Sequence, residues 1–298
     1  MSAAITTRGL TKFYEERAVV RELDWEVPVG AAVALLGPNG AGKSTTLKLL
    51  LGFTPASAGD VRILGSDPWE LAPETRARIG YVSEKPILPP WIRVERLIAF
   101  HASLYPRWDR VLAHELAATF VLNGSRRVGE LSKGQNRALM LLLALSQRPE
   151  LLLLDEPASG QDVAARRAFL QLLADYLSDG ERTLVISSHL LTDVERLVSH
   201  VAILRAGRLI AHAPLDGLKE SIRQVRLPIA AADQLRANLP AGCVLASAEA
   251  GRSALLTLQL DGRALEDLLD GVAREQVEVA GLPLEEIYLA LVGAERPE

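Results

Sequence analysis

A glycine-rich loop between an apolar run and a helix is the feature that most restricts what this chain can fold into. Residues Gly37 to Ser44 fit the pattern G-x-x-x-x-G-K-[ST]. The apolar run Ala31 to Leu36 precedes the loop and predicts a buried strand, while Ser44 to Leu51 predicts a helix. This order of strand, loop and helix indicates an α/β core with a phosphate-binding loop.

Two side chains of the loop suit the phosphates and their counter-ion. We expect Lys43 to contact the β and γ phosphates and Ser44 to offer its hydroxyl to Mg²⁺. The positive end of the following helix points at the same anion, which favours phosphate binding over a simple glycine turn. The loop residues expected to contribute backbone N–H groups or room for the phosphates are Gly37, Pro38, Asn39, Gly40, Ala41 and Gly42.

A second apolar run ends in two carboxylates. Leu151 to Leu154 predicts a buried parallel strand, and Asp155 and Glu156 follow it, before Pro157 stops the strand. Ligands bind at this edge of an α/β sheet. Asp155 suits Mg²⁺ held through water, and Glu156 suits polarising an attacking water. A solvated acidic loop would look the same, but the glycine loop upstream favours the catalytic interpretation.

A possible second phosphate-binding surface lies before the apolar helix predicted at Asn136 to Leu145. Ser132 and Gln135 form an S-x-x-Q capping box, which marks a helix start. The same arrangement directs the Ser132 hydroxyl and the Gly134 N–H outward beside a positive helix end, as a phosphate site requires. From these residues alone both interpretations remain open.

The order of patterns along the chain predicts an α/β protein with two domains. Ala3 to Val33 reads as a small antiparallel sheet, and helical spacing replaces it over about 86–145, where we expect an inserted helical subdomain. Two later apolar strands flank a helix from about Val163 to Tyr176, which predicts a parallel sheet. We expect a phosphate-binding α/β domain over 1–217 and a small α+β module over 218–298.

Composition limits the partners of this chain. A formal charge of −4 and a pI near 5.8 provide no basic field for nucleic acid, and the adjacent Arg126 and Arg127 read as ordinary solvated surface. The single cysteine, Cys243, excludes an internal disulfide and favours a reducing compartment. Charges or prolines interrupt every apolar stretch before it could span a bilayer. We therefore expect membrane contact only through a partner.

The motifs together resemble the nucleotide-binding subunit of the ABC transporter family over about residues 3–215. Gly37 to Thr45, with Thr45 as its last residue, resembles the Walker A loop, and Leu151 to Glu156 resembles the Walker B strand. The residues that resemble the signature sequence are Leu131, Ser132, Lys133, Gly134 and Gln135, with Lys133 where glycine is usual. The residues that resemble the D-loop at the dimer seam are Ser159, Gly160, Gln161 and Asp162, after Ala158.

Three further positions take their expected roles from this resemblance. His189 resembles the switch histidine that binds the γ-phosphate, and Tyr14 resembles the aromatic that stacks on adenine. An aromatic packed on an edge strand would look the same as Tyr14. Glu84 stands where the family generally has a glutamine that touches Mg²⁺, and glutamate there is similar to one branch of exporters.

The resemblance implies an ATPase that uses ATP and Mg²⁺ and works as a dimer around two nucleotides, most simply a homodimer. It also implies a membrane-spanning transporter subunit as partner, a place at the cytoplasmic face of the cell membrane, and export as the direction. Two alternatives are a soluble ABC-type ATPase without a transport role and a nucleotide-sensing regulatory subunit. Residues 218–298 resemble accessory domains of exporters, whose role here is either regulatory or stabilising.

Overall fold

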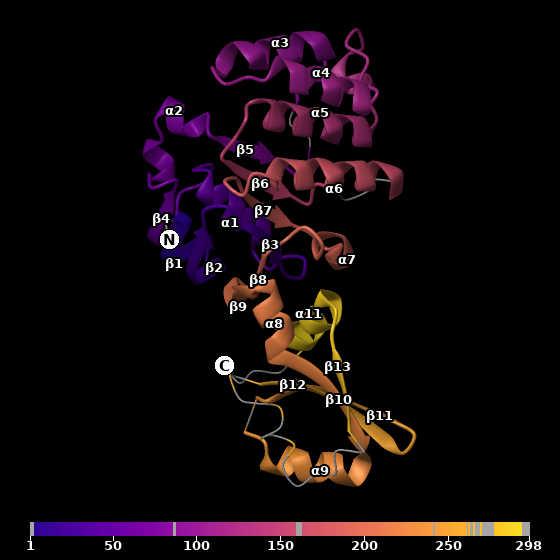
Figure 1. The fold of residues 1–298 in the computed structure, drawn as a ribbon. Coiled ribbons are helices and arrows are strands. Elements are labelled where there is room, and N and C mark those ends of the chain that lie inside the picture. The colour runs from indigo at the N-terminus through magenta and orange to yellow at the C-terminus, as the bar shows by residue number, and fades with distance from the viewer. Residues whose placement is uncertain are drawn as a thin grey trace. The chain divides into compact units, whose positions relative to one another are not determined.

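The computed structural model describes residues 3–85, 88–158, 163–240, 242–260 and 277–293, together with positions 262, 265 and 269. The chain divides into two compact units, Met1–His212 and Ala213–Glu298, which are coloured from indigo to orange and from orange to yellow in Figure 1. The sequence predicts a boundary after Gly217, close to this division. None of the helices within the described ranges is both long and apolar enough to cross a bilayer.

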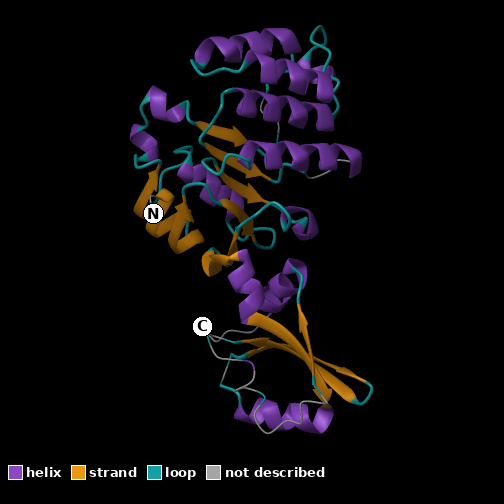
Figure 2. Cartoon of the chain, in the orientation of Figure 1, coloured by secondary structure: helices purple, strands orange, loops and turns teal. Residues whose placement is uncertain are grey.

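A six-stranded sheet forms the centre of the first unit, in the order β5-β6-β7-β3-β8-β9 (Figure 2). Its strands are β3 (Ala32–Leu36), β5 (Ile79–Val82), β6 (Leu151–Asp155), β7 (Thr183–Ser187), β8 (His200–Arg205) and β9 (Arg208–Pro214). From β5 to β8 each neighbouring pair is parallel. Every residue of β3, β6 and β7 is buried, as expected of parallel strands covered on both faces. The carboxyl ends of these three adjacent strands therefore share one edge.

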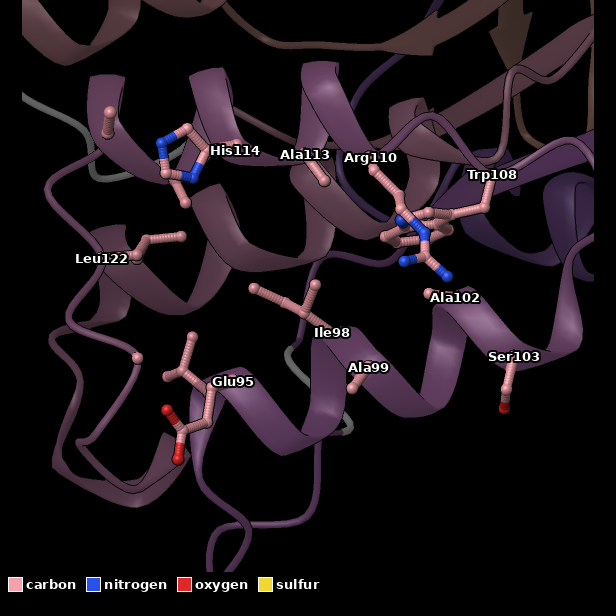
Figure 3. A pocket seen from close by; sticks show the side chains of 14 residues that line it. Glu95, Ile98, Ala99, Ala102, Ser103, Trp108, Arg110, Ala113, His114 and Leu122 are labelled. Atoms are coloured by element: carbon pink, nitrogen blue, oxygen red, sulfur yellow. The ribbon is translucent and has the colours of Figure 1, made fainter.

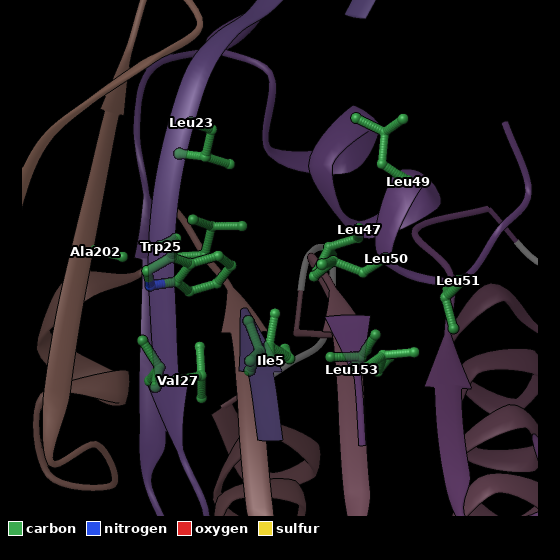
Figure 4. Close-up of a cluster of buried hydrophobic side chains, with 14 of the residues drawn as sticks. Ile5, Leu23, Trp25, Val27, Leu47, Leu49, Leu50, Leu51, Leu153 and Ala202 are labelled. Atoms are coloured by element: carbon green, nitrogen blue, oxygen red, sulfur yellow. The ribbon is translucent and has the colours of Figure 1, made fainter. Parts of the chain in front are cut away.

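A second, antiparallel sheet packs with helix α1 against this centre. It consists of β1 (Ala3–Tyr14), β2 (Arg17–Pro28) and β4 (Ala58–Ile63), in the order β2-β1-β4. Helix α1 (Lys43–Leu50) follows β3 directly. Figure 4 shows Ile5 and Trp25 from the antiparallel sheet, Leu47 and Leu50 from α1, and Leu153 from β6 in one buried cluster. This packing fixes the start of α1 relative to the sheet edge.

The stretch between β5 and β6 is helical. It contains α3 (Val94–Leu104), α4 (Arg110–Thr119), the 3₁₀ turn η2 (Val128–Glu130) and α5 (Lys133–Ser146). The remaining short helices of the unit are η1 (Pro68–Glu70), α2 (Pro73–Arg76) and α7 (Leu191–Val194), and a longer one is α6 (Val163–Leu177). All residues of α5 from Ala138 onward are buried, so α5 joins this stretch to the core.

The second unit has a sheet and core of its own. Its sheet has the order β11-β12-β10-β13 and is antiparallel. Its described elements are α8 (Leu215–Ser221), β10 (Ile222–Pro228), α9 (Ile229–Asn238), β11 (Val244–Ala250), β12 (Ser253–Gln259), β13 (Glu278–Gly281) and α11 (Leu284–Gly293). Val225, Leu256 and Leu258 of the sheet pack with Leu235 of α9. The predicted α/β class, with parallel core, antiparallel sheet and helices, is confirmed.

Candidate functional site

The glycine loop adopts a conformation that only glycine accommodates at its key positions. Gly42, the residue before α1, has φ 105°, and a Cβ there would lie 2.7 Å from the Val19 carbonyl oxygen. A Cβ on Gly37 would lie 2.4 Å from the Leu204 carbonyl oxygen. The loop is thus pressed between β2 and β8, and a side chain at either glycine would displace it from the sheet edge.

The Lys43 side chain is folded back into this loop. Its Nζ donates a hydrogen bond to the Gly37 carbonyl oxygen at 2.7 Å, and the residue is only 7% exposed. The same Nζ lies 3.7 Å from Glu156 Oε1. The ammonium group is therefore fixed between the loop and the end of β6, where it can exchange a carbonyl for an anionic oxygen.

Asp155 ties the loop to two strands. As the last residue of β6 it is 2% exposed, and its Oδ1 accepts hydrogen bonds from Ser44 Oγ at 3.0 Å and from Ser187 Oγ at 2.9 Å. Ser187 Oγ in turn accepts the Glu156 backbone N–H at 2.9 Å. The sequence predicts Ser44, Asp155 and Glu156 as site residues but not Ser187. The signal that could have identified Ser187 is its position at the end of the next predicted core strand.

Glu156 has a strained backbone, and His189 contacts its carboxylate. Its φ of 47° lies in the left-handed region, which costs a residue with a side chain about 1–3 kcal/mol. Glu156 Oε2 is 2.6 Å from His189 Nδ1 and accepts the His189 backbone N–H at 3.3 Å. The Glu156 side chain is 14% exposed, whereas that of His189 is 55% exposed. His189 thus covers the carboxylate on the solvent side.

One cavity of about 580 Å³ contains most of these groups. The described residues that line it are Val19, Asn39, Gly40, Ala41, Gly42, Lys43, Ser44, Thr45, Glu84, Glu156 and His189. Val19 was not predicted; it lies at an irregularity in the β1–β2 pairing, between Ala18 and Val20, with its carbonyl oxygen against Gly42. Neither Tyr14 nor the signature-like residues 131–135 belong to this lining.

The signature-like residues form the start of α5. The predicted capping box is confirmed: Ser132 Oγ accepts the Gln135 N–H at 3.1 Å, and Gln135 Oε1 accepts the Ser132 N–H at 3.2 Å. Leu131 is buried, and Ser132 and Lys133 are exposed. The four D-loop candidates, 159–162, lie outside the described residues.

Helix α5 also contacts the loop that carries Glu84. Arg137 Nη2 donates to the Glu84 carbonyl oxygen at 3.3 Å. Burial raises the pKa of Tyr81, on the strand before this loop, and the negative charges of Asp155 and Glu84 raise the pKa of the phenol further. This end of β5 is therefore an electronegative environment, suited to a cation beside Glu84.

A separate cavity of about 660 Å³ lies between α3 and α4 (Figure 3). Alanines such as Ala99, Ala102 and Ala113 line it, and Glu95 and Arg110 lie near its ends. None of the predicted site residues belongs to its lining, so it is distinct from the glycine-loop cavity.

Comparisons with known sequences agree with this geometry. The family model described as ABC transporter matches residues 20–159. The Nod factor export ATP-binding protein I of Cupriavidus metallidurans is 36% identical, with 74% of each chain covered. The bacitracin transport ATP-binding protein BcrA of Bacillus licheniformis is 32% identical, with 75% of this chain and 74% of the relative covered.

Solved structures show the same fold. An ATP-binding subunit of an ABC transporter superposes with a TM-score of 0.66 at 28% identity, covering 73% of this chain and 92% of that one. A dimeric ATP-binding cassette bound to ADP and Pi gives a TM-score of 0.64 at 21% identity, covering 71% and 98%. With the glycine loop, Asp155 and Glu156 assembled as described, these relationships show that the chain belongs to the ABC transporter family, as an ATP-binding and ATP-hydrolysing subunit.

Proposed function

We propose that two copies of this chain hold two ATP molecules between them and drive a membrane-spanning transporter subunit. One observation carries the proposal: Lys43, Glu156 and His189 line one cavity, whereas the signature-like residues 131–135 of the same copy do not line it. A second copy would supply its own Ser132 and Gly134 to the exposed side of the triphosphate. Each copy would then complete the site of the other.

Nucleotide binding starts at the glycine loop. The backbone N–H groups of the loop, which all its residues except Pro38 carry, and the positive end of α1 attract the phosphates. Lys43 exchanges the Gly37 carbonyl for β and γ phosphate oxygens. Tyr14 stacks on the adenine. The residue is 46% exposed at the end of β1, which leaves room for a base against its ring.

The residues present fit Mg²⁺. Ser44 Oγ and Asp155 Oδ1 are 3.0 Å apart, and Glu84 lines the same cavity as Ser44. Hydroxyl and carboxylate oxygens together with phosphate oxygens are the ligand set that Mg²⁺ prefers. Ser44 would ligate it directly, and Asp155 and Glu84 would hold it through water or their carboxylates. When bound, Mg²⁺ neutralises charge on the β and γ phosphates.

Hydrolysis requires a positioned water. Glu156 accepts a proton from the water as the water oxygen bonds to the γ-phosphorus, and the bond from that phosphorus to the β–γ bridging oxygen breaks, so that ADP leaves. His189 holds the carboxylate in place and donates a hydrogen bond to the γ-phosphate. In the geometry described, His189 Nδ1 contacts the Glu156 carboxylate, which can only accept, so Nε2 is the ring atom available for the phosphate and donates to it when both ring nitrogens carry a proton.

The second copy closes the site. Ser132 and the start of its α5 present a hydroxyl, backbone N–H groups and a positive helix end to the γ-phosphate. Each charge-assisted hydrogen bond contributes about 1.5–3 kcal/mol, so several across two sites stabilise a closed dimer. Loss of the γ-phosphate removes them, and the dimer opens.

The membrane partner docks on an apolar cavity of about 340 Å³ between the core and the helical stretch. Phe53 and Tyr81 line it from the core, in edge-on contact at 5.6 Å, while Tyr105 and Met140 line it from the helices. Ser83, next to Glu84, belongs to the same lining, so a bound segment would sense the nucleotide site. We further propose that the chain works at the cytoplasmic face of the membrane and that transport is outward, and the export named for the relative supports this direction.

Purification of the native complex from membranes tests this proposal. We expect this chain to be isolated as two copies with a membrane-spanning subunit, and the reconstituted complex to move a solute outward only with ATP and Mg²⁺. Isolation without any membrane protein, or solute movement unaffected by Lys43→Ala, would contradict the transport role.

A further inference from the structure

A buried lysine lies behind the aromatic ring expected to bind adenine. Lys12 is only 8% exposed, and within the described residues its ammonium group has no carboxylate partner. Its Nζ donates a hydrogen bond to the Pro55 carbonyl oxygen at 2.8 Å. A buried cation stabilised by one neutral carbonyl is costly, so its remaining contact requires an explanation.

The remaining contact is with Tyr14. Lys12 Nζ lies 5.0 Å from the centroid of the Tyr14 ring, within the range of a cation–π interaction. Lys12 and Tyr14 are two residues apart on β1 and so project from the same face of the strand. The hydrogen bond to Pro55 fixes the ammonium group, and the ammonium group covers one side of the ring.

The β1–β2 hairpin carries this pair to the nucleotide cavity. Lys12 pairs with Val20 and Tyr14 with Arg17 across the hairpin. Val19 lies between these two pairs on β2, lines the cavity, and has its carbonyl oxygen against Gly42. The end of the hairpin is therefore anchored at the glycine loop, beside which a base attached to bound phosphates must extend.

We propose that Lys12 is a positioning residue for the nucleotide base, which acts through Tyr14. The proposal rests on the proposed function, because it requires ATP with its adenine on Tyr14. The ammonium group binds the electron-rich face of the ring, holds the ring plane, and leaves the opposite face for the base. By withdrawing electron density it also makes the phenol ring a better stacking partner for an electron-rich purine.

Binding of two ligands separates this role from a purely structural one. ATP carries a base, whereas inorganic tripolyphosphate carries the phosphates alone, so we would titrate both, with Mg²⁺, into the full chain. Lys12→Met removes the charge at similar length, Lys12→Arg restores it, and Lys48→Met, an exposed lysine on α1, is the matched control. Thermal unfolding verifies that each variant is folded.

We expect Lys12→Met to weaken ATP binding about two- to fivefold, because the Tyr14 ring is no longer held for the base, and to leave tripolyphosphate binding unchanged. Lys12→Arg should retain the affinity for ATP. In a Tyr14→Leu background, Lys12→Met should have no further effect, because the ring through which it acts is absent.

Equal weakening of ATP and tripolyphosphate, or the same loss with Leu at position 14, would overturn the inference. Unchanged ATP affinity in Lys12→Met would do so as well. Each of these results leaves wild-type ATP binding intact. Failure of the proposed function would appear differently: the Lys43→Ala variant would bind ATP and tripolyphosphate as tightly as the wild-type chain does.

Discussion

His189 Nδ1 lies 2.6 Å from Glu156 Oε2, and the His189 backbone N–H donates to the same oxygen at 3.3 Å. The other carboxylate oxygen, Oε1, lies 3.7 Å from Lys43 Nζ. Histidine and lysine thus hold opposite ends of one carboxylate, whose backbone is fixed through Ser187. A base held in this way needs no rearrangement of its own before a water attacks.

Glu156→Gln should separate binding from hydrolysis. The amide keeps the shape of the side chain but cannot accept the proton, so we expect turnover to fall by about 10²–10⁴-fold while ATP binding is retained. With ATP and Mg²⁺ this variant should elute as a dimer in size-exclusion chromatography. Glu74→Gln, on the exposed α2, is the control. Hydrolysis by Glu156→Gln at the unmutated rate would show that Glu156 is not the base.

The sequence predicts the parts of the site whose chemistry is local. Phosphate binding by backbone N–H groups requires glycines before a helix. Position 42 has a positive φ, which explains why glycine occupies it. The Ser132 capping box is likewise a local pattern, and its two hydrogen bonds are both found. These features need no knowledge of distant residues.

The remaining contacts depend on tertiary packing. Ser187 reaches Asp155 because β7 lies beside β6, and Val19 reaches the loop through the register of β2. Lys12 donates to the Pro55 carbonyl oxygen, 43 residues along the chain, and no local pattern predicts that contact. Arg137 and Glu84 are 53 residues apart, with α3, α4 and η2 between them, so their contact could not be predicted from spacing.

The cap of α4 should be measurable in stability. Asp109 Oδ1 accepts the Leu112 N–H at 2.8 Å, and Oδ2 accepts Arg148 Nε at 2.9 Å. Asp109→Ala should cost about 1–2 kcal/mol, whereas Asp109→Asn, which can still cap the helix, should cost less than half as much. Urea unfolding monitored by circular dichroism gives both values. If Asp109→Ala and Asp109→Asn lose the same free energy of unfolding, the loss comes from the ion pair with Arg148 and not from the helix cap.

Acid should weaken the ion pairs that Glu150, just before β6, forms with Arg78, just before β5, and with Arg107, between α3 and α4. A hydrogen bond from Arg78 holds the pKa of Glu150 below its usual range, against the opposing effect of burial, and Arg107 adds to the lowering. Because the folded pKa is depressed, this stabilisation is present above the unfolded pKa and is lost as pH falls through the folded one.

Wild type should therefore be more stable than Glu150→Gln at pH 7, and the difference should shrink below about pH 4.5, where unfolded glutamate protonates. Unfolding midpoints of the two proteins, measured from pH 7 to pH 3, provide the comparison. A difference that stays constant over this range would mean that the ionised carboxylate contributes nothing.

Ser132→Arg should disable the ATP site of the neighbouring copy and leave the ATP site of its own chain intact. The bulky side chain occupies the space that the neighbouring triphosphate needs, so turnover should be lost, while ATP affinity of the isolated chain stays within about twofold, because 131–135 do not line its own cavity. Ser178→Arg, exposed at the end of α6, is the control. Loss of ATP affinity together with turnover would indicate misfolding instead.

Mixing two inactive variants tests most directly whether each copy completes the other's site. Lys43→Ala removes the phosphate contact of one chain, and Ser132→Arg removes what the other chain offers across the seam. In a mixed dimer one site carries both lesions and the other carries neither, so ATPase activity should reappear on mixing. A mixture no more active than its two separate components would contradict the shared-site account.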